Sequence, residues 1–441
     1  MIQEINERTL ASIQNPVFRD YARQYVNIYQ DFLSQVSAMG IELAPEEDAQ
    51  IYQEETQRMA GKGAVLRNDA KSVVVNRISP GCEACQTSVG SATFFVSLKC
   101  HRNCFFCFNP NQENYDYFCE HKIDVVKQLK ELHDSGQTMD QLALTGGEPL
   151  LFKSETIRFF QAAREYFPQA ATRLYTSGDQ IDEETLQQLK TAGLDEIRFS
   201  IRMYDLEKGR QFTLERIALA KAYIPRVMVE MPILPGTLDE MKSILLRLDE
   251  IGVFGINLLE LCFPFNNVDE FRQRGYHVKA RPFRVLYDYW YAGGLPIAES
   301  ETVCLQLVDF ALQAGLKMGV HYCSLENKHT GQVYQQNKTA SHPSWLQFSE
   351  NDYFFRSAKV FGEDVPRVKK IFAQHDFADY DENTEWKYLE FPINKINWLK
   401  KTAVEIGIST QIAETRSGEK VLRELKIDWT TPQIFKYKKD I

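Results

Sequence analysis

Short apolar runs alternate with amphipathic stretches between about residue 92 and residue 265. The β-rich runs predict six strands, over 93–100, 141–147, 172–178, 196–203, 226–233 and 256–263. Between two of them, Leu238, Met241 and Leu245 recur at helical spacing, and Asp182 is placed to N-cap a helix that ends near Gly193. Strands that alternate with helices indicate βαβ units and a parallel sheet. Since six units are too few for a closed eight-stranded barrel, we predict an α/β fold with an open, partial (β/α)6 barrel.

The flanking regions have different patterns. The polar stretch around 17–33 has helical spacing, which predicts a helical N-terminal extension. After the barrel, a helix is expected over 302–315 and a strand over 316–323. Beyond residue 345, a small C-terminal α+β domain is predicted, with strands over 353–362, 386–393, 409–418 and 420–429 and helices over 366–374 and 397–407. The expected division is therefore 1–75, 76–340 and 341–441.

Composition narrows the functional classes. The chain has 441 residues, a formal net charge of -9 and a pI near 5.6, which argues against a general binder of nucleic acids or anionic membranes. No apolar run approaches the roughly 18 residues that span a bilayer, and the start resembles no signal peptide. The cytoplasm is the expected compartment. Nine cysteines, an odd number, predict metal or redox chemistry there rather than a disulfide framework.

The stretch "CHRNCFFC" places three cysteines, Cys100, Cys104 and Cys107, at the end of the first predicted strand and in the loop after it. Parallel barrels carry their chemistry at the carboxyl ends of strands. Three thiolates can hold three irons of a 4Fe-4S cluster and leave the fourth iron open to another ligand. The neighbouring aromatic residues would keep water out; they are Phe105, Phe106 and Phe108. The alternatives are a zinc site, completed by His101 or His121, and buried structural cysteines.

The spacing CxxxCxxC at this position resembles that of radical S-adenosylmethionine (SAM) enzymes, and the resemblance covers about residues 92–265. The second predicted strand ends in "TGGEPL", which is similar to the GGE motif of that family. A more particular resemblance runs from "GCEAC" through "YTSGDQIDEETLQQLKTAGLDEIRF". It is to a poorly characterised group related to the pyruvate formate-lyase activating enzymes.

The resemblance implies roles for individual residues around the cosubstrate, whose methionine moiety would chelate the open iron. Glu148, with the backbone of Gly146 and Gly147, would receive its amino group, because a carboxylate suits a charge-assisted hydrogen bond. Ser177 and Ser200 correspond to ribose-binding positions. Arg202 would pair with the cosubstrate carboxylate, and Phe106 would face adenine. The alternative is that "GGEP" is only a turn, that the polar residues only end strands, and that Phe106 only packs the loop. Glu230 and Glu260 match the adenine and ribose contacts of the family only loosely.

The remaining cysteines suggest a second centre. Cys82 and Cys85 have CxxC spacing just before the first barrel strand, and Cys323 at a later strand end is the best candidate partner. An auxiliary iron-sulfur cluster is one interpretation, zinc with His321 is another, and a redox dithiol or a structural role is a third. Cys304 fits a helix core. Cys119 has no assignment, and Cys262 either donates a hydrogen atom or lines the pocket.

The resemblance implies reductive cleavage of SAM to methionine and a 5′-deoxyadenosyl radical that abstracts hydrogen from a substrate. It also implies an electron donor such as flavodoxin or ferredoxin. Because the N-terminal helices, the extra cysteines and the C-terminal domain would cover an open barrel, we expect a peptide or protein substrate. The alternatives are an enzyme acting on a small molecule and a non-catalytic iron-sulfur or zinc binding protein, which would have no use for "TGGEP".

Overall fold

The computed structural model describes residues 2–45, 49–288 and 293–437, which divide into two units. One unit comprises Met1–Ala38, Phe283–Tyr287 and Gln332–Ile441, and the other comprises Met39–Pro282 and Asp288–Gly331. The second unit contains the predicted barrel. Within the described residues, no helix has the length and the apolar character needed to cross a membrane.

The barrel unit is built on a nine-stranded sheet with the order β2-β3-β12-β9-β8-β7-β6-β5-β4. All six predicted strands are present, parallel and in chain order: β4 (Ser91–Phe95), β5 (Gln141–Thr145), β6 (Ala171–Thr176), β7 (Glu196–Phe199), β8 (Arg226–Ile233) and β9 (Gly255–Glu260). Since β4 and β2 stand at opposite ends of the strand order, the sheet is open, as predicted.

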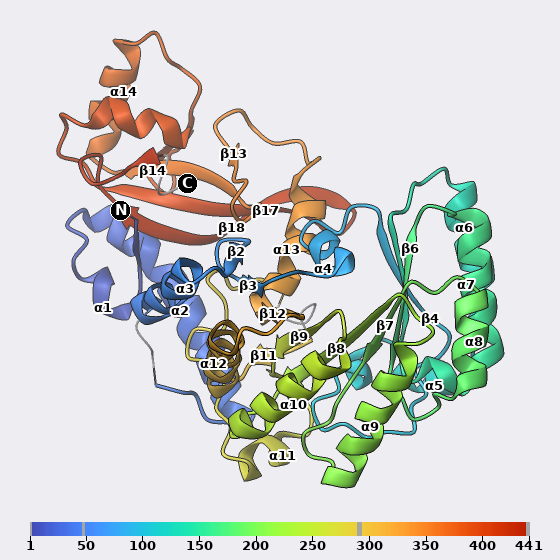
Figure 1. Cartoon of the computed structure of the whole chain (residues 1–441). Helices are drawn as coiled ribbons and strands as arrows, with labels where there is room; N and C mark the ends of the chain where they lie inside the picture. Colours follow the sequence, from blue (N-terminus) through green and yellow to red (C-terminus); the bar gives the residue numbers. More distant parts are fainter. Residues whose placement is uncertain (1, 46–48, 289–292, 438–441) are drawn as a thin grey trace. The chain divides into compact units, whose positions relative to one another are not determined.

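Helices follow the parallel strands and cover one side of the sheet (Figure 1). They are α6 (Val125–Asp134), α7 (Lys153–Tyr166), α8 (Glu183–Thr191), α9 (Glu207–Ala220) and α10 (Leu238–Ile251). The predicted cap of α8 is confirmed, because the Asp182 carboxylate accepts a hydrogen bond of 2.7 Å from the backbone N–H of Thr185. The packed side chains are large and apolar; Phe159 and Phe160 of α7 are both fully buried.

Three further strands extend the sheet beyond β9. The predicted strand near 316–323 is β12 (Gly319–Cys323), which pairs parallel with β9 after the predicted helix α12 (Ala298–Ala314). Two strands that we did not predict follow it antiparallel, β3 (Ser72–Val75) and β2 (Val65–Arg67). The predicted helical N-terminal extension thus contains α3 (Ala49–Gly61), but its last residues form β3 and β2 instead of helix. Three consecutive valines in a fully buried strand explain the difference, because β-branched residues favour strands.

The other unit is an antiparallel sheet with the order β1-β18-β17-β14-β16-β15, and β13 pairs with β14. Its strands are β1 (Gln3–Glu4), β13 (Gln347–Phe348), β14 (Phe355–Phe361), β15 (Asp381–Asn383), β16 (Tyr388–Phe391), β17 (Ile406–Arg416) and β18 (Glu419–Thr430). Residues from both chain ends share this unit, because Gln3 pairs with Trp429 and the ring of Phe18 stacks on Phe361 at 4.6 Å. Phe18 lies on α2 (Pro16–Ala38). Whether 1–75 and 341–441 fold as separate domains stays a prediction.

One predicted helix in this unit is wrong. Residues 397–407 do not form an α-helix; a three-ten helix, η3 (Ile393–Leu399), ends there and β17 begins at Ile406. Val404 and Ile406 are buried in the same core, and the sheet pairing of β17 outweighs the local helical pattern. The predicted helix over 366–374 is confirmed as α14 (Asp364–Ala373).

The remaining elements are short or connect the barrel strands. They are α1 (Glu7–Leu10), α4 (Pro80–Cys85), α5 (Tyr115–Glu120), α11 (Val268–Gln273), α13 (Leu325–Asn337), β10 (Cys262–Phe263), β11 (Leu295–Pro296), η1 (Asn109–Asn111) and η2 (Pro149–Phe152).

Candidate active site at the strand ends

The glycines after β5 bring the "GGE" turn against the backbone that leads into the cysteine loop. The N–H of Gly147 donates to the carbonyl of Ser97 at 3.1 Å, and the N–H of Glu148 donates to the carbonyl of Lys99 at 2.9 Å. A Cβ atom at Gly147 would stand 2.0 Å from the Lys99 oxygen. Only glycine permits this approach, and the pairing places Glu148 beside the residue that precedes Cys100.

The three cysteines of "CHRNCFFC" lie in the irregular segment after β4. Cys100 is exposed, and Cys104 and Cys107 are half-buried. The N–H of Cys107 donates to the carbonyl of Cys104 at 2.9 Å, and the Cys100 sulfur accepts from the N–H of Arg102 at 3.4 Å. Burial is the main cause that raises the pKa of Cys107 to about 11, and the neighbouring Cys104 and Cys100 add to it.

The zinc alternative at this loop requires at least three ligands that converge on one ion. Among the described residues, no three His, Cys, Asp or Glu side chains are gathered closely enough to hold one metal ion. In a 4Fe-4S cluster each thiolate binds its own iron, so such a group does not require that its ligands converge on one point. The two histidines that we considered for zinc have other partners: His101 Nε2 lies 2.7 Å from Asp179, and His121 Nδ1 lies 3.0 Å from the carbonyl of Tyr117.

The aromatic residues of the loop differ in burial. Phe105 is 7% exposed and packs edge-on against Phe106, Tyr204 and Phe271. Phe106 is half-buried and touches Tyr204 at a ring distance of 5.9 Å. Phe108 is 46% exposed, so Phe105 and Phe106 are the better placed of the three to keep water from the cysteines, and the role expected of Phe108 stays a prediction.

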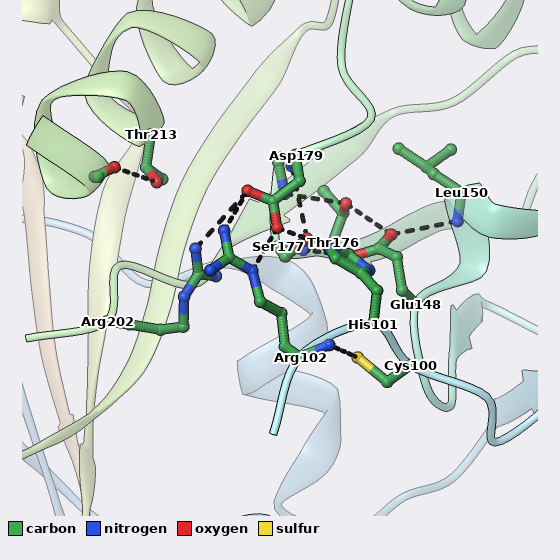
Figure 2. A network of polar contacts seen from close by, with 12 residues as sticks. Cys100, His101, Arg102, Glu148, Leu150, Thr176, Ser177, Asp179, Arg202 and Thr213 are labelled. Carbon is green, nitrogen blue, oxygen red and sulfur yellow. Dashed lines mark hydrogen bonds and ion pairs between the residues drawn. The ribbon is translucent and has the colours of Figure 1, made fainter. Parts of the chain in front are cut away.

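Glu148 is buried, and its carboxylate is held by the neighbouring strand end (Figure 2). Oε1 accepts hydrogen bonds from the Thr176 hydroxyl at 2.8 Å and from the N–H of Leu150 at 3.1 Å. Oε2 accepts one from the N–H of Ser177 at 2.7 Å. A carboxylate offers about four acceptor positions, so one remains for a further donor.

The other predicted cosubstrate residues lie at the ends of β6 and β7. The Ser177 hydroxyl accepts a 3.4 Å hydrogen bond from the N–H of Asp179, and Ser200 is half-buried, with its N–H donating to the carbonyl of Thr176. Arg202 is 3% exposed, and its Nε donates to Asp205 at 3.0 Å. Its Nη2 lies 3.7 Å from Asp179 but makes no hydrogen bond among the described residues. The site thus contains a buried donor that a carboxylate would satisfy.

Asp179 is a site residue that the sequence reasoning missed. Arg102 donates to it from two nitrogens, Nε to Oδ2 and Nη2 to Oδ1, both at 2.6 Å. Figure 2 shows Arg102 and Arg202 reaching the same carboxylate. Burial raises the pKa of Asp179, but hydrogen bonds from Arg102 and His101 and the charge of Arg202 outweigh it and hold the pKa well below its usual range. The polar residue directly after "TSG" at a strand end was the available signal.

The second group of cysteines is formed by Cys82 and Cys85 of α4 and Cys323 at the end of β12. Burial is the main cause that raises the pKa of Cys323 to about 12, and the negative charges that Cys85 and Cys82 can carry contribute to the rise. Two of the sulfurs accept amide hydrogen bonds, Cys82 from Asn257 at 3.7 Å and Cys323 from Asn327 at 3.3 Å.

The weaker candidates from the sequence have partners inside the protein. Glu230 accepts a hydrogen bond from Asn257 at 2.8 Å and forms an ion pair with Arg198. Glu260 is 2% exposed, forms an ion pair with Lys279 and accepts from the N–H of Leu325 at 2.6 Å. These contacts are those of residues that tie strand ends together. Cys304 is fully buried on α12, as expected of a core residue.

Comparison with known proteins shows which family part of this chain is similar to. The model of one protein family, described as the Radical SAM superfamily, matches residues 95–248. A protein of Methanocaldococcus jannaschii, whose name provisionally describes it as a glycyl-radical enzyme activating enzyme, is 31% identical over 212 residues. The alignment covers 46% of this chain and 56% of that protein, so the chain spans just over half the length of this relative.

Solved structures resemble the chain more distantly. SuiB from Streptococcus suis, bound to S-adenosylmethionine, is 12% identical with a TM-score of 0.40, over 55% of this chain and 52% of that one. Coproporphyrinogen III oxidase (HemN) from Escherichia coli is 16% identical with a TM-score of 0.36, over 55% of this chain and 58% of that one.

Proposed function

Residues 95–248 make this chain a member of the radical SAM superfamily, and on this premise we propose that it cleaves SAM reductively and uses the resulting radical to abstract hydrogen from a peptide or protein. The observation that supports cleavage is the adjacency of two motifs. The N–H of Glu148 in "GGE" is bonded to the carbonyl of Lys99, the residue before Cys100. One ligand could therefore touch both the cysteine loop and the turn.

The residues at this edge of the sheet fit the cosubstrate and its cluster. Cys100, Cys104 and Cys107 would hold the 4Fe-4S cluster, which when bound supplies the electron that splits SAM into methionine and a 5′-deoxyadenosyl radical. Glu148 has one acceptor position left for an ammonium group. Arg202 Nη2 is a buried donor without a hydrogen bond among the described residues, and a carboxylate would supply one.

The other proposed contacts are less constrained. Ser177 and Ser200 would bind the ribose from the ends of β6 and β7, and Phe106 would lie against adenine beside Tyr204. Backbone groups of Gly146 and Gly147 would help to receive the amino group. The Gly146 carbonyl already accepts a 2.7 Å hydrogen bond from Asn109 and has a second lone pair for this purpose.

A peptide or protein substrate is supported by the name of the M. jannaschii relative, since an activating enzyme of that kind acts on another protein. A small-molecule substrate is the alternative. The electron would come from a donor such as flavodoxin or ferredoxin. For the auxiliary centre, the supporting observation is that Cys82 and Cys323 accept amide hydrogen bonds from Asn257 and Asn327, because hydrogen bonds to the sulfurs tune the potential of an iron-sulfur cluster.

The decisive experiment measures 5′-deoxyadenosine. Anaerobically reconstituted protein with dithionite and SAM should release it, and Cys104→Ala should not, because one iron loses its ligand. Cys304→Ala is the matched control, since Cys304 is a fully buried core cysteine of α12. Undiminished release by Cys104→Ala would overturn the assignment. No release by the wild type would favour the non-catalytic metal-binding alternative.

The substrate class requires its own measurement. Deuterium should move from a deuterated candidate peptide into 5′-deoxyadenosine if that peptide is the substrate. If no candidate peptide transfers deuterium to 5′-deoxyadenosine but a deuterated small molecule does, the small-molecule alternative would be favoured.

A further inference from the structure

The cysteine loop is tied to the rest of the barrel unit by side chains from outside it. Asn267 donates to the carbonyl of Phe105 at 3.1 Å, and Asn109 after the third cysteine donates to the carbonyl of Gly146 at 2.7 Å. The first half of the loop is held by Asp179, which binds both His101 and Arg102. The two asparagine contacts are neutral hydrogen bonds, whereas Asp179 forms an ion pair with Arg102.

The contact between Asp179 and Arg102 has the geometry of a strong ion pair. Two parallel hydrogen bonds of 2.6 Å join the guanidinium to both carboxylate oxygens, and bidentate pairs of this kind fix orientation as well as distance. The Asp179 side chain is only 13% exposed. Because it is partly withdrawn from water, the pair is screened less than an ordinary surface pair.

Asp179 is held by residues that follow two neighbouring strands. It lies three residues after the end of β6, next to Gly178 with φ of +85°, and its own N–H donates to the Ser177 hydroxyl. Arg202, three residues after the end of β7, has its Nη2 atom 3.7 Å from the Asp179 carboxylate. Asp179 therefore connects the segments after β6 and β7 to His101 and Arg102, the two residues that directly follow Cys100.

We propose that Asp179 is a positioning residue, which holds His101 and Arg102 so that the thiols of Cys100 and Cys104 are arranged for a cluster before any cosubstrate binds. The inference rests on the proposed function, because it supposes that these cysteines hold iron. Its physical basis is preorganisation: an irregular loop that is already fixed loses less conformational entropy when its side chains bind.

The test measures how fast iron leaves the reconstituted protein for a ferrous chelator, without SAM. Asp179→Asn removes the charge and one acceptor from the pair, and Arg102→Gln removes the pair from the other side. Each should raise the release rate about tenfold, the effect of a small loss of binding free energy. The double variant should release iron more slowly than the product of the two single effects predicts, because both changes remove the pair between Asp179 and Arg102. Asp179→Glu keeps the charge and should restore part of the wild-type rate.

Asp195→Asn is the matched control. Asp195 lies directly before β7, at the amino ends of the strands and so away from the cysteine loop. It forms an ion pair with Arg164 and accepts a 2.8 Å hydrogen bond from the N–H of Thr172. Its loss should lower the thermal midpoint but leave iron release within about twofold of the wild type. The electron paramagnetic resonance spectrum of the reduced cluster should change in Asp179→Asn and Arg102→Gln only.

Several outcomes would overturn the inference. They are equal release rates for Asp179→Asn and Asp195→Asn, a double variant whose effect is the product of the single effects, and a change in Asp179→Asn that is seen only when SAM is present. The last would make Asp179 a cosubstrate ligand. Should Asp179→Asn fail to fold, the more exposed Arg102→Gln carries the test. Failure of the proposed function looks different, since wild type and Cys104→Ala would then bind iron equally, and the inference would fall with it.

Discussion

The carboxylate of Glu148 accepts a hydrogen bond of 2.7 Å from the backbone N–H of Ser177, and this contact joins the ends of β5 and β6. Its other oxygen accepts from the N–H of Leu150 at 3.1 Å. Both oxygens thus face groups that can only donate. Glu148 therefore supports the backbone of the site in addition to any contact with a ligand.

We predict that Glu148→Gln lowers both stability and cosubstrate affinity. Whichever way the amide of glutamine is turned, its NH2 group would face a backbone N–H, which should cost about 1–3 kcal/mol of unfolding free energy. Loss of the charge should raise the dissociation constant for SAM about ten- to a hundredfold while the cluster absorption survives. Denaturant titration and anaerobic SAM titration would measure the two effects.

The matched control is Glu155→Gln, because Glu155 pairs with Lys122 on the surface at the start of α7 and such pairs contribute little. Unchanged SAM affinity together with reduced stability of Glu148→Gln would leave Glu148 a purely structural residue. Unchanged stability would contradict the hydrogen-bond argument.

Gly147→Ala should prevent a stable cluster from forming. The added methyl group would stand 2.0 Å from the Lys99 oxygen, so the backbone before Cys100 would have to move. Iron content after reconstitution measures the effect. Gly61→Ala in α3 is the control, since a Cβ there meets nothing within 4 Å, and alanine should raise stability by about 0.5–1 kcal/mol. A Gly147→Ala protein that binds iron like the wild type would refute the close approach.

A triple variant with Cys82, Cys85 and Cys323 changed to alanine should lose the auxiliary centre and keep the radical cluster. If both are cubane clusters, iron should fall from about eight to about four atoms per chain. Elemental analysis for iron and zinc distinguishes the alternatives. Loss of zinc with constant iron would identify a zinc site, and no change in either metal would leave the three cysteines structural.

Phe18→Ala should destabilise the antiparallel sheet unit. Phe18 is fully buried, and its ring lies parallel to that of Phe361 at 4.6 Å, so truncation should cost about 3–5 kcal/mol. Hydrogen exchange of β14 amides, followed by mass spectrometry, should report the loosening. Ile28→Ala on the same helix, where the side chain is 58% exposed, should leave the exchange of β14 nearly unchanged. If exchange of the β14 amides stayed as slow in Phe18→Ala as in the wild type, α2 and the sheet would not be one cooperative unit.

Local patterns in the sequence were sufficient for the barrel strands and for several helices. Each barrel strand is a short apolar run bounded by polar or turn residues, and the Asp182 cap acts on a residue three positions later. The cysteine spacing and "GGE" likewise indicated the family from contiguous residues, later supported by the match over 95–248. Information of this kind is local, and a window of a few residues contains it.

The contacts that organise the site were decided only by the tertiary structure. Asp179 and Arg102 are separated by 77 positions, and Glu148 and Ser177 by 29. Likewise, "SVVV" is a strand because β12 pairs with it, and 397–407 is not an α-helix because β17 is needed in the sheet. Periodicity reports which face of an element is apolar, but the partner of a charged or polar group depends on the register of distant segments. That register minimises the free energy of the whole unit, which no short stretch of the sequence determines.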